Sequence, residues 1–316
     1  LSVERAVVIG NGNVALDVAR MLALTPEELA VTDVADHALH ALRDSAVKEI
    51  IVLGRRGPAQ AAFTNPELRE LAELQDADVV VDPADAVLDP HSQAFLSGAD
   101  ATTRRNVETL AKYAELEPRH KPKRVVLRFL TSPVEIVGSD RVEGLVVERN
   151  ELVLGEDGAL RARATGQRET IETGLVMRSI GYVGSPLPGV PFDARRSTIN
   201  NERGRVIDPD TGQPIPGLYA AGWIKRGPSG VIGTNKKDAL ETTSLILEDH
   251  AAGALPEPSG DRDELIAALS ARGVAFIEYD GWRSIDAHER SSGEPHGRPR
   301  VKLVRRDDLL ARAKPR

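Results

Sequence analysis

The chain has 316 residues, more than the roughly 250–300 that one hydrophobic core usually serves, so we expect two domains. It contains no cysteine, which excludes disulfides, thiolate metal sites, self-ligated iron–sulfur clusters and dithiol relays within these residues. With 41 Lys and Arg against 48 Asp and Glu, the net charge is -7, which disfavours a general nucleic-acid or membrane-surface binder.

The hydropathy pattern and the first residues of the chain predict its cellular location and whether it is part of a longer protein. No apolar run approaches the roughly 18 residues of a membrane span, and no signal-peptide pattern opens the chain, so we expect a cytoplasmic protein. The first residue is Leu1, and a buried-strand pattern follows almost at once. This start predicts a piece of a longer parent protein, in which a further domain could precede Leu1.

The first half of the chain reads as a strand–helix–strand unit. Residues 5–9 form a short apolar run, residues 15–24 are an Ala- and Leu-rich helix, and residues 25–45 are a second helical stretch capped by Thr25. Residues 49–53 are a second buried strand. A helical crossover between two such strands predicts a parallel sheet.

The pattern then changes twice. A helix over 66–74 and a short strand over 78–81 continue the unit, while residues 83–122 are polar, partly helical and not placed further. Alternating strands from residue 124 to 154, with a turn at Gly138 and Ser139, predict an antiparallel excursion. The fold class expected for residues 1–185 is therefore α/β and Rossmann-like, a parallel sheet with helices on both faces plus this excursion.

A second domain is expected over residues 186–316, after a Gly- and Pro-rich boundary. It begins with a hairpin and buried strand over 204–223, followed by a helix over 234–249 and a linker over 253–260. A further helix from Asp261 ends with Gly273 as its cap.

Three constellations carry chemistry, and the first is a glycine turn. Residues 10–15 form a G-x-G-x-x-A turn between a strand and a helix, the context that dinucleotide binding requires. Gly10 permits the tight turn, and Gly12 lets backbone N–H groups approach a pyrophosphate. The alternative is a glycine turn with a structural role alone.

The second constellation is a pair of arginines, Arg55 and Arg56, at the end of the second strand. An NAD site carries an acidic residue there to bind the ribose 2′-hydroxyl, whereas two guanidinium groups suit a 2′-phosphate. The pair therefore predicts NADP(H), against the alternative of a solvated strand end. It lies about 40 residues beyond the glycines instead of the usual ~20, which the helical stretch 25–45 explains.

The third constellation is a turn over residues 222–235 that holds four glycines and follows a buried strand. Glycine allows close approach of a flat ligand such as a flavin, and Trp223 could cover the ring, although it could equally be a core residue. Glu67 and Glu70 share one face of the helix over 66–74, where they could simply complement the helix dipole.

Long strings of the sequence resemble a known family. VVIGNGNVALDVARML, GRRGPAQAAFTNPELREL, GLYAAGWIKRGPSGVIGTNKKDA and IDAHERSSGEPHGRPRVKL are similar to adrenodoxin-reductase-type NADPH:ferredoxin reductases, including the actinobacterial ones. The resemblance covers essentially the whole chain. It implies an NADP domain joined to the C-terminal part of a Rossmann-like FAD domain, and an enzyme that passes a hydride from NADPH to FAD and then single electrons to a ferredoxin-type iron–sulfur protein.

The resemblance also assigns roles. It implies that Asn11, Gly12, Asn13 and Val14 contact the NADP pyrophosphate. It implies that Glu67 contacts the NADP and that Glu70, our candidate catalytic residue, lies near the nicotinamide. The flavin contacts that it implies are Gly222, Trp223, Gly230, Val231 and Ile232. The family's N-terminal flavin-binding glycine turn has no counterpart here, so we expect a C-terminal portion with weak FAD binding and no turnover of its own.

Two other functions remain open from the sequence: an NADP(H)-binding module without redox activity, and an electron-input subunit like that of glutamate synthase. The tail over 283–316 has ten Lys or Arg and five Asp or Glu. It could steer an acidic ferredoxin or form a solvated face.

Overall fold

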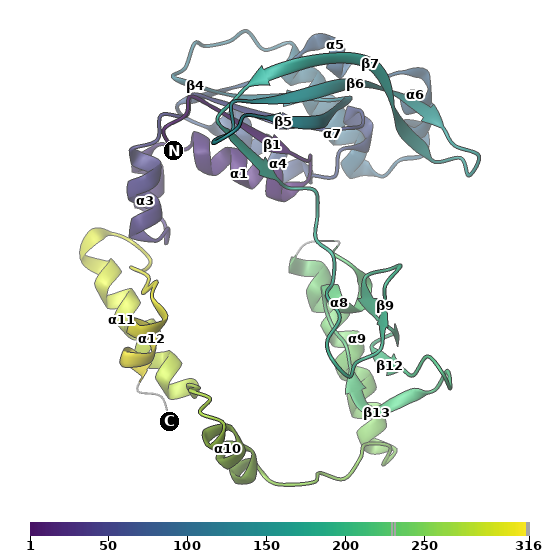
Figure 1. Ribbon diagram of the computed structural model, residues 1–316, viewed down its shortest axis with the longest axis vertical. Helices are drawn as coiled ribbons and strands as arrows, with labels where there is room; N and C mark the ends of the chain where they lie inside the picture. The colour runs from purple at the N-terminus through teal and green to yellow at the C-terminus, as the bar shows by residue number, and fades with distance from the viewer. Residues whose placement is uncertain (229, 231, 314–316) are drawn as a thin grey trace. The chain divides into compact units, whose positions relative to one another are not determined.

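The computed structural model describes residues 1–228, 230 and 232–313 (Figure 1). The chain divides into two compact units. The first unit comprises residues 1–180 and 276–316, and the second unit comprises residues 181–275. The predicted division at residue 185 differs from this one, because residues 276–316 associate with the first unit and not with the second.

A parallel five-stranded sheet forms the centre of the first unit. Its order is β3-β4-β2-β1-β8, with β1 at Arg5–Ile9, β2 at Glu49–Leu53, β3 at Ala77–Val81, β4 at Lys123–Arg128 and β8 at Leu175–Arg178. Central β2 is buried along its whole length, which explains the apolar run over its residues 50–53. The parallel α/β sheet predicted from the sequence is confirmed.

The two faces of this sheet are covered differently. Alternate strand residues such as Val8 and Val52 pack with the helices α1 (Asn13–Ala23), α4 (Asn65–Glu70) and α7 (Ala101–Ala114). The opposite residues, such as Val7 and Ile51, pack with an antiparallel sheet of β5 (Thr131–Val137), β6 (Gly144–Leu154) and β7 (Leu160–Glu172). The predicted helices on both faces are corrected here, because inward apolar residues of β6 and β7 cover the second face.

Residues 83–122 contain three helices that the sequence analysis did not place. They are α5 (Pro83–Ala86), α6 (Pro90–Gly98) and α7, and each begins at an aspartate that accepts hydrogen bonds from the first turn. These aspartates are Asp82, Asp89 and Asp100. Because an aspartate cap satisfies otherwise free amides, the pattern Asp-Pro at 82–83 and 89–90 is a usable start signal.

The stretch over 25–45 is two short helices instead of one. Thr25 caps α2 (Pro26–Ala30) through a reciprocal capping box with Glu28, and α3 (Asp36–Arg43) follows after a break. The tail packs on this insertion and forms α11 (Tyr279–Gly293) and α12 (Arg306–Ala313). Two short 3₁₀ helices also belong to the unit: η2 (Leu71–Glu73) follows α4, and η3 (Glu294–His296) follows α11.

The second unit is small and built around one long helix. Short strands β9 (Phe192–Asp193) and β10 (Thr198–Ile199) pair, as do β11 (Asn201–Glu202), β12 (Arg205–Ile207) and β13 (Pro214–Tyr219). The helices are α8 (Trp223–Arg226), α9 (Ile232–Ala251) and α10 (Arg262–Ala271). Gly273 follows α10 with φ +67°, which confirms it as the terminating glycine. In the part of the chain that the structure describes, no helix has the length and apolar character needed to cross a bilayer.

Candidate functional site

Gly10 makes the tight turn between β1 and α1. Its φ is +127°, and a Cβ there would lie 2.0 Å from the carbonyl oxygen of Ser179. Its N–H donates to the carbonyl of Leu53 at 2.9 Å, which ties the turn to the end of β2. Another residue at this position would therefore be strained and would clash.

Gly12 opens the turn to a ligand. It is the N-cap of α1, and a Cβ built on it would meet no heavy atom within 4 Å. The first turn of α1 contains no acidic residue, and Val14 within it is 42% exposed. The helix N-terminus therefore presents backbone N–H groups and partial positive charge to open space, which suits an anion.

The asparagines of the turn hold it in place. Asn13 Oδ1 accepts a hydrogen bond from the Thr64 N–H at 2.7 Å, and the Asn11 carbonyl accepts one from the Ala62 N–H at 3.0 Å. The Asn11 side chain also fills the space beside Gly54, where a Cβ would lie 2.7 Å from Asn11 Nδ2. The Asn13 side-chain oxygen is thus engaged within the protein, so Asn13 would contact an anion through its N–H donors.

The arginine pair follows β2, next to the glycine turn. Arg55 is exposed and Arg56 is partly buried. Burial, and secondly the positive charge of Arg55, lower the pKa of the Arg56 guanidinium. Both effects penalise the free cation, so a bound anion would relieve them.

A groove of about 590 Å³ adjoins Arg56. It is lined mostly by apolar groups from α6 and from the β6–β7 hairpin, including Phe95, Leu154 and Leu160. Phe95 and Leu154 are 47% and 58% exposed. Sequence reasoning missed these residues because the groove forms only when the hairpin lies beside α6.

The two glutamates of α4 differ in their surroundings. Glu67 Oε2 is buried and has no hydrogen-bond partner among residues 1–228, 230 and 232–313. Glu70 forms an ion pair with Arg20 on α1, and its side chain is 46% exposed. Glu67 Oε2 can therefore accept a hydrogen bond from a ligand, whereas the Glu70 carboxylate is already paired with Arg20.

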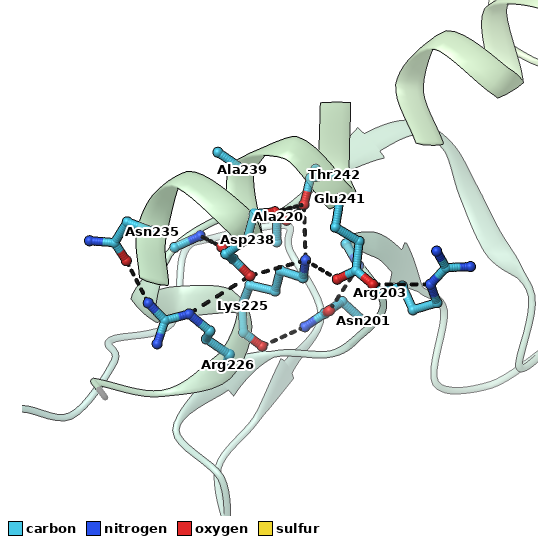
Figure 2. Close-up of polar contacts among 12 residues, drawn as sticks. Asn201, Arg203, Ala220, Lys225, Arg226, Asn235, Asp238, Ala239, Glu241 and Thr242 are labelled. Atoms are coloured by element: carbon cyan, nitrogen blue, oxygen red, sulfur yellow. Dashed lines mark hydrogen bonds and ion pairs between the residues drawn. The ribbon is translucent and has the colours of Figure 1, made fainter. Parts of the chain in front are cut away.

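The glycine-rich turn of the second unit is held by an ionic cluster, drawn in Figure 2. The Gly222 N–H donates to Asp238 on α9, and Gly222 has φ +76°. Buried Lys225 bonds to Asp238 at 3.1 Å and to Glu241 at 2.8 Å. The cluster therefore fixes the backbone from which Trp223 projects.

Trp223 is 43% exposed, which argues against the alternative of a core tryptophan. Its ring lies 5.7 Å from that of Tyr182, centroid to centroid. Gly230 has φ +84°. Val231 lies outside the described residues, and Ile232 is described only as the start of α9.

Two groups of predicted residues thus come together separately. In the first unit, the glycine turn and the arginines lie at the carboxyl ends of adjacent strands, β1 and β2, with α4 next to the turn. Gly222, Trp223 and Gly230 lie in the second unit. The carboxyl edge of a parallel sheet is where such folds bind nucleotides.

No family model matches the chain. It is 48% identical over 315 residues to NADPH-ferredoxin reductase FprA of Mycobacterium tuberculosis, covering 98% of this chain and 67% of that protein. It is 40% identical over 325 residues to human mitochondrial NADPH:adrenodoxin oxidoreductase, covering 98% and 64%. The solved structure of M. tuberculosis FprA in complex with NADPH has a TM-score of 0.86 at 48% identity, over 98% of this chain and 67% of that one.

Proposed function

Because the chain belongs to the NADPH-ferredoxin reductase family, we propose that its first unit binds NADP(H) for an enzyme that passes electrons to a ferredoxin-type iron–sulfur protein. The family makes the chain an oxidoreductase and disfavours a nucleotide-sensing module or a glutamate-synthase-like subunit. The observation that carries the proposal is the arginine pair beside the open glycine turn. A cytoplasmic location is part of the same proposal.

The residues of the first unit fit NADP(H). The N-terminus of α1 at Gly12 suits the pyrophosphate, and Arg55 and Arg56 suit the 2′-phosphate. The apolar groove beside Arg56 is large enough for an adenine ring. The unpartnered oxygen of Glu67 would accept a hydrogen bond from the coenzyme, and Glu70 stays the candidate nearest the nicotinamide.

The turn of the second unit has features that suit FAD. FAD takes up a hydride from NADPH and releases single electrons, and the protein supplies orientation and exclusion of water. Exposed Trp223 could cover a planar ring, and the positive-φ glycines Gly222 and Gly230 permit close backbone approach. Contacts by Val231 and Ile232 stay predictions.

The chain spans about two thirds of FprA. The predictions that a flavin-binding segment is missing and that this chain binds FAD weakly gain no support from the comparisons. They stay predictions. A visible absorption spectrum of the purified chain after incubation with FAD tests the second of them, the strength of FAD binding.

The arginine pair gives the direct test. Arg55→Ala with Arg56→Ala should weaken NADP⁺ binding by about 2–4 kcal/mol, because two charge-assisted contacts to the 2′-phosphate are lost. NAD⁺ binding should change little, since NAD⁺ lacks that phosphate. Calorimetric titration of both coenzymes measures the difference.

A matched control is the exposed pair Arg195 and Arg196 in the second unit. Replacing both by alanine removes the same charge while leaving the site intact. Equal losses for NADP⁺ and NAD⁺ in the Arg55/Arg56 variant, or an equal effect of the control, would contradict the assignment.

A further inference from the structure

The backbone that carries Arg55 and Arg56 is held by a buried asparagine from outside the sheet. Asn150 lies on β6 and is 5% exposed. Its Nδ2 donates to the Arg55 carbonyl at 2.9 Å and to Ser132 Oγ at 2.7 Å. Since Asn150 comes from the antiparallel sheet, this contact joins that sheet to the arginine loop.

A buried glutamine holds the other side of the loop. Gln60 is 9% exposed, and its Oε1 accepts a hydrogen bond from the Gly57 N–H at 3.1 Å. Its Nε2 donates to Ser92 Oγ at 3.2 Å, and Ser92 is 1% exposed. Gln60 therefore fastens the loop to α6, which also lines the groove.

Leu130, at the corner between β4 and β5, completes the support. It has φ +51°, a conformation that is costly for leucine. Its N–H donates to the Arg56 carbonyl at 3.0 Å, and its own carbonyl accepts from the Asn150 N–H at 2.7 Å. The carbonyls of both arginines and the N–H of Gly57 are thus all occupied by protein partners.

Such support matters because adjacent cations repel each other. Without a bound anion, Arg55 and Arg56 would be pushed apart if their backbone could move. Arginine also loses considerable rotamer freedom when it is immobilised on a ligand. A fixed backbone holds the Cα atoms of both arginines in place, so only side-chain freedom is lost when a phosphate binds.

We propose that Asn150 and Gln60 are positioning residues that set the preference of this site for a 2′-phosphorylated coenzyme. They act through the backbone on either side of Arg56, Asn150 through the Arg55 carbonyl and Gln60 through the Gly57 N–H. The antiparallel sheet is then part of the selectivity apparatus and not only a cover for the parallel sheet. This inference rests on the proposed binding of NADP(H) at the arginine pair.

The test uses adenosine 2′,5′-bisphosphate and adenosine 5′-diphosphate, of which only the first has a 2′-phosphate. Both are titrated calorimetrically into the full chain, so no flavin or turnover is needed. Asn150→Ala should weaken binding of the 2′,5′-bisphosphate by about tenfold, the scale of one net hydrogen bond. Binding of the 5′-diphosphate should change less than about twofold.

Gln60→Met removes the acceptor for the Gly57 N–H while keeping the side-chain volume. It should likewise weaken binding of the 2′,5′-bisphosphate more than binding of the 5′-diphosphate. It tests the claim from the other side of the loop, so the result does not depend on the folding of Asn150→Ala. The matched control is Thr173→Val. Thr173 is 5% exposed, and its Oγ1 donates to the Arg5 carbonyl at 2.9 Å at the opposite end of the sheet.

The expected result is that the affinity for the 2′,5′-bisphosphate falls relative to that for the 5′-diphosphate in both Asn150→Ala and Gln60→Met. In Thr173→Val the ratio of the two affinities should be unchanged. Equally weakened binding of both ligands, or an unchanged ratio of their affinities, in both Asn150→Ala and Gln60→Met overturns the inference. A wild-type chain without preference for the 2′-phosphate, or one whose preference survives loss of Arg55 and Arg56, overturns the proposed function instead.

Discussion

The buried Glu67 carboxylate destabilises the folded protein and is also proposed to bind the coenzyme. A buried polar oxygen without a partner destabilises a protein by about 1–3 kcal/mol, and Glu67 Oε2 is such an atom within residues 1–228, 230 and 232–313. A coenzyme donor would remove this cost. The folded protein without coenzyme would then be less stable than its packing permits, as is common at binding sites.

Glu67→Met should therefore raise the free energy of unfolding by about 1 kcal/mol in the absence of coenzyme, because methionine fills similar volume without a polar oxygen. The same variant should weaken the binding of NADP⁺ and of NAD⁺ to a similar extent, since the proposed contact of Glu67 does not involve the 2′-phosphate, which is the group that distinguishes the two coenzymes. Denaturant unfolding and calorimetric titration measure the two effects. Glu73→Met, at an exposed position of the same segment, is the control. A destabilised Glu67→Met with unaltered coenzyme affinity would contradict this expectation.

The site residues that could be predicted are those marked by the sequence immediately around them. Gly10, Gly12 and the arginine pair follow the ends of apolar runs, so spacing alone placed them. Asn150 was not predictable in this way, because it reaches Arg55 across 95 positions in the sequence. Its partner is a backbone carbonyl, which carries no sequence signature.

At the scale of elements, apolar runs located β1 and β2 well. The strand from residue 124 was predicted as part of the antiparallel excursion, but β4 pairs in parallel with β2 and β3 in the central sheet, and the excursion begins only at β5. The helices over 83–114 were missed because their buried positions are few, although their aspartate caps were visible. The insertion over 25–45 was read as one helix because residues 31–35 include no glycine or proline. Its break is explained by tertiary contacts, since Arg298 binds the carbonyls of Thr32 and Val34.

An ionic cluster links three elements of the second unit, β12, β13 and α9. Arg205 on β12 binds Asp249 on α9 through two hydrogen bonds of 2.7 and 2.8 Å, and the Tyr219 hydroxyl of β13 donates to Asp249 at 2.5 Å. The hydrogen bond from Arg205, followed by that from Tyr219, lowers the pKa of Asp249 from 3.8 to about 2. The folded state therefore favours the ionised carboxylate.

The sign of the pH effect follows from that shift. Because the folded pKa lies below the unfolded value, the stability from Asp249 is present above about pH 4 and is lost as pH falls toward 2. Asp249→Asn should have a lower thermal midpoint than the wild type at pH 7, and the difference should shrink between pH 4 and pH 2. Calorimetric scans across this range measure it. Glu248→Gln, whose side chain is 65% exposed, should show a smaller difference; a gap for Asp249→Asn that stays constant with pH would refute the pairing.

At the scale of the whole molecule, the tail over 276–316 belongs to the first unit through specific contacts. Arg298 pairs with Asp36 and Lys302 with Asp33 in the insertion over 25–45, while Arg300 pairs with Asp286 and Glu289 within the tail itself. Cations bound within the protein contribute less to attracting an acidic partner. The contacts therefore favour a structural role for much of the basic tail, while its proposed steering of a ferredoxin stays a prediction.

Arg298 is the contact on which the placement of the tail should depend most. Its side chain is 8% exposed, and it donates to the carbonyls of Thr32 and Val34 as well as to the Asp36 carboxylate at 2.5 Å. Arg298→Ala should weaken docking of the tail by about 2–4 kcal/mol, because several hydrogen bonds from one buried cation are lost together.

Hydrogen exchange of α11 should then rise by at least about tenfold, and α3 should lose protection in parallel, because both lie next to the broken contact. Binding of adenosine 2′,5′-bisphosphate should stay the same, since Arg298 contacts the insertion and not the carboxyl edge of the sheet. Exposed Arg305, replaced by alanine, controls for the loss of one positive charge in the tail. If α11 kept its protection in Arg298→Ala, the tail would have to be held by its other contacts, and this expectation would be wrong.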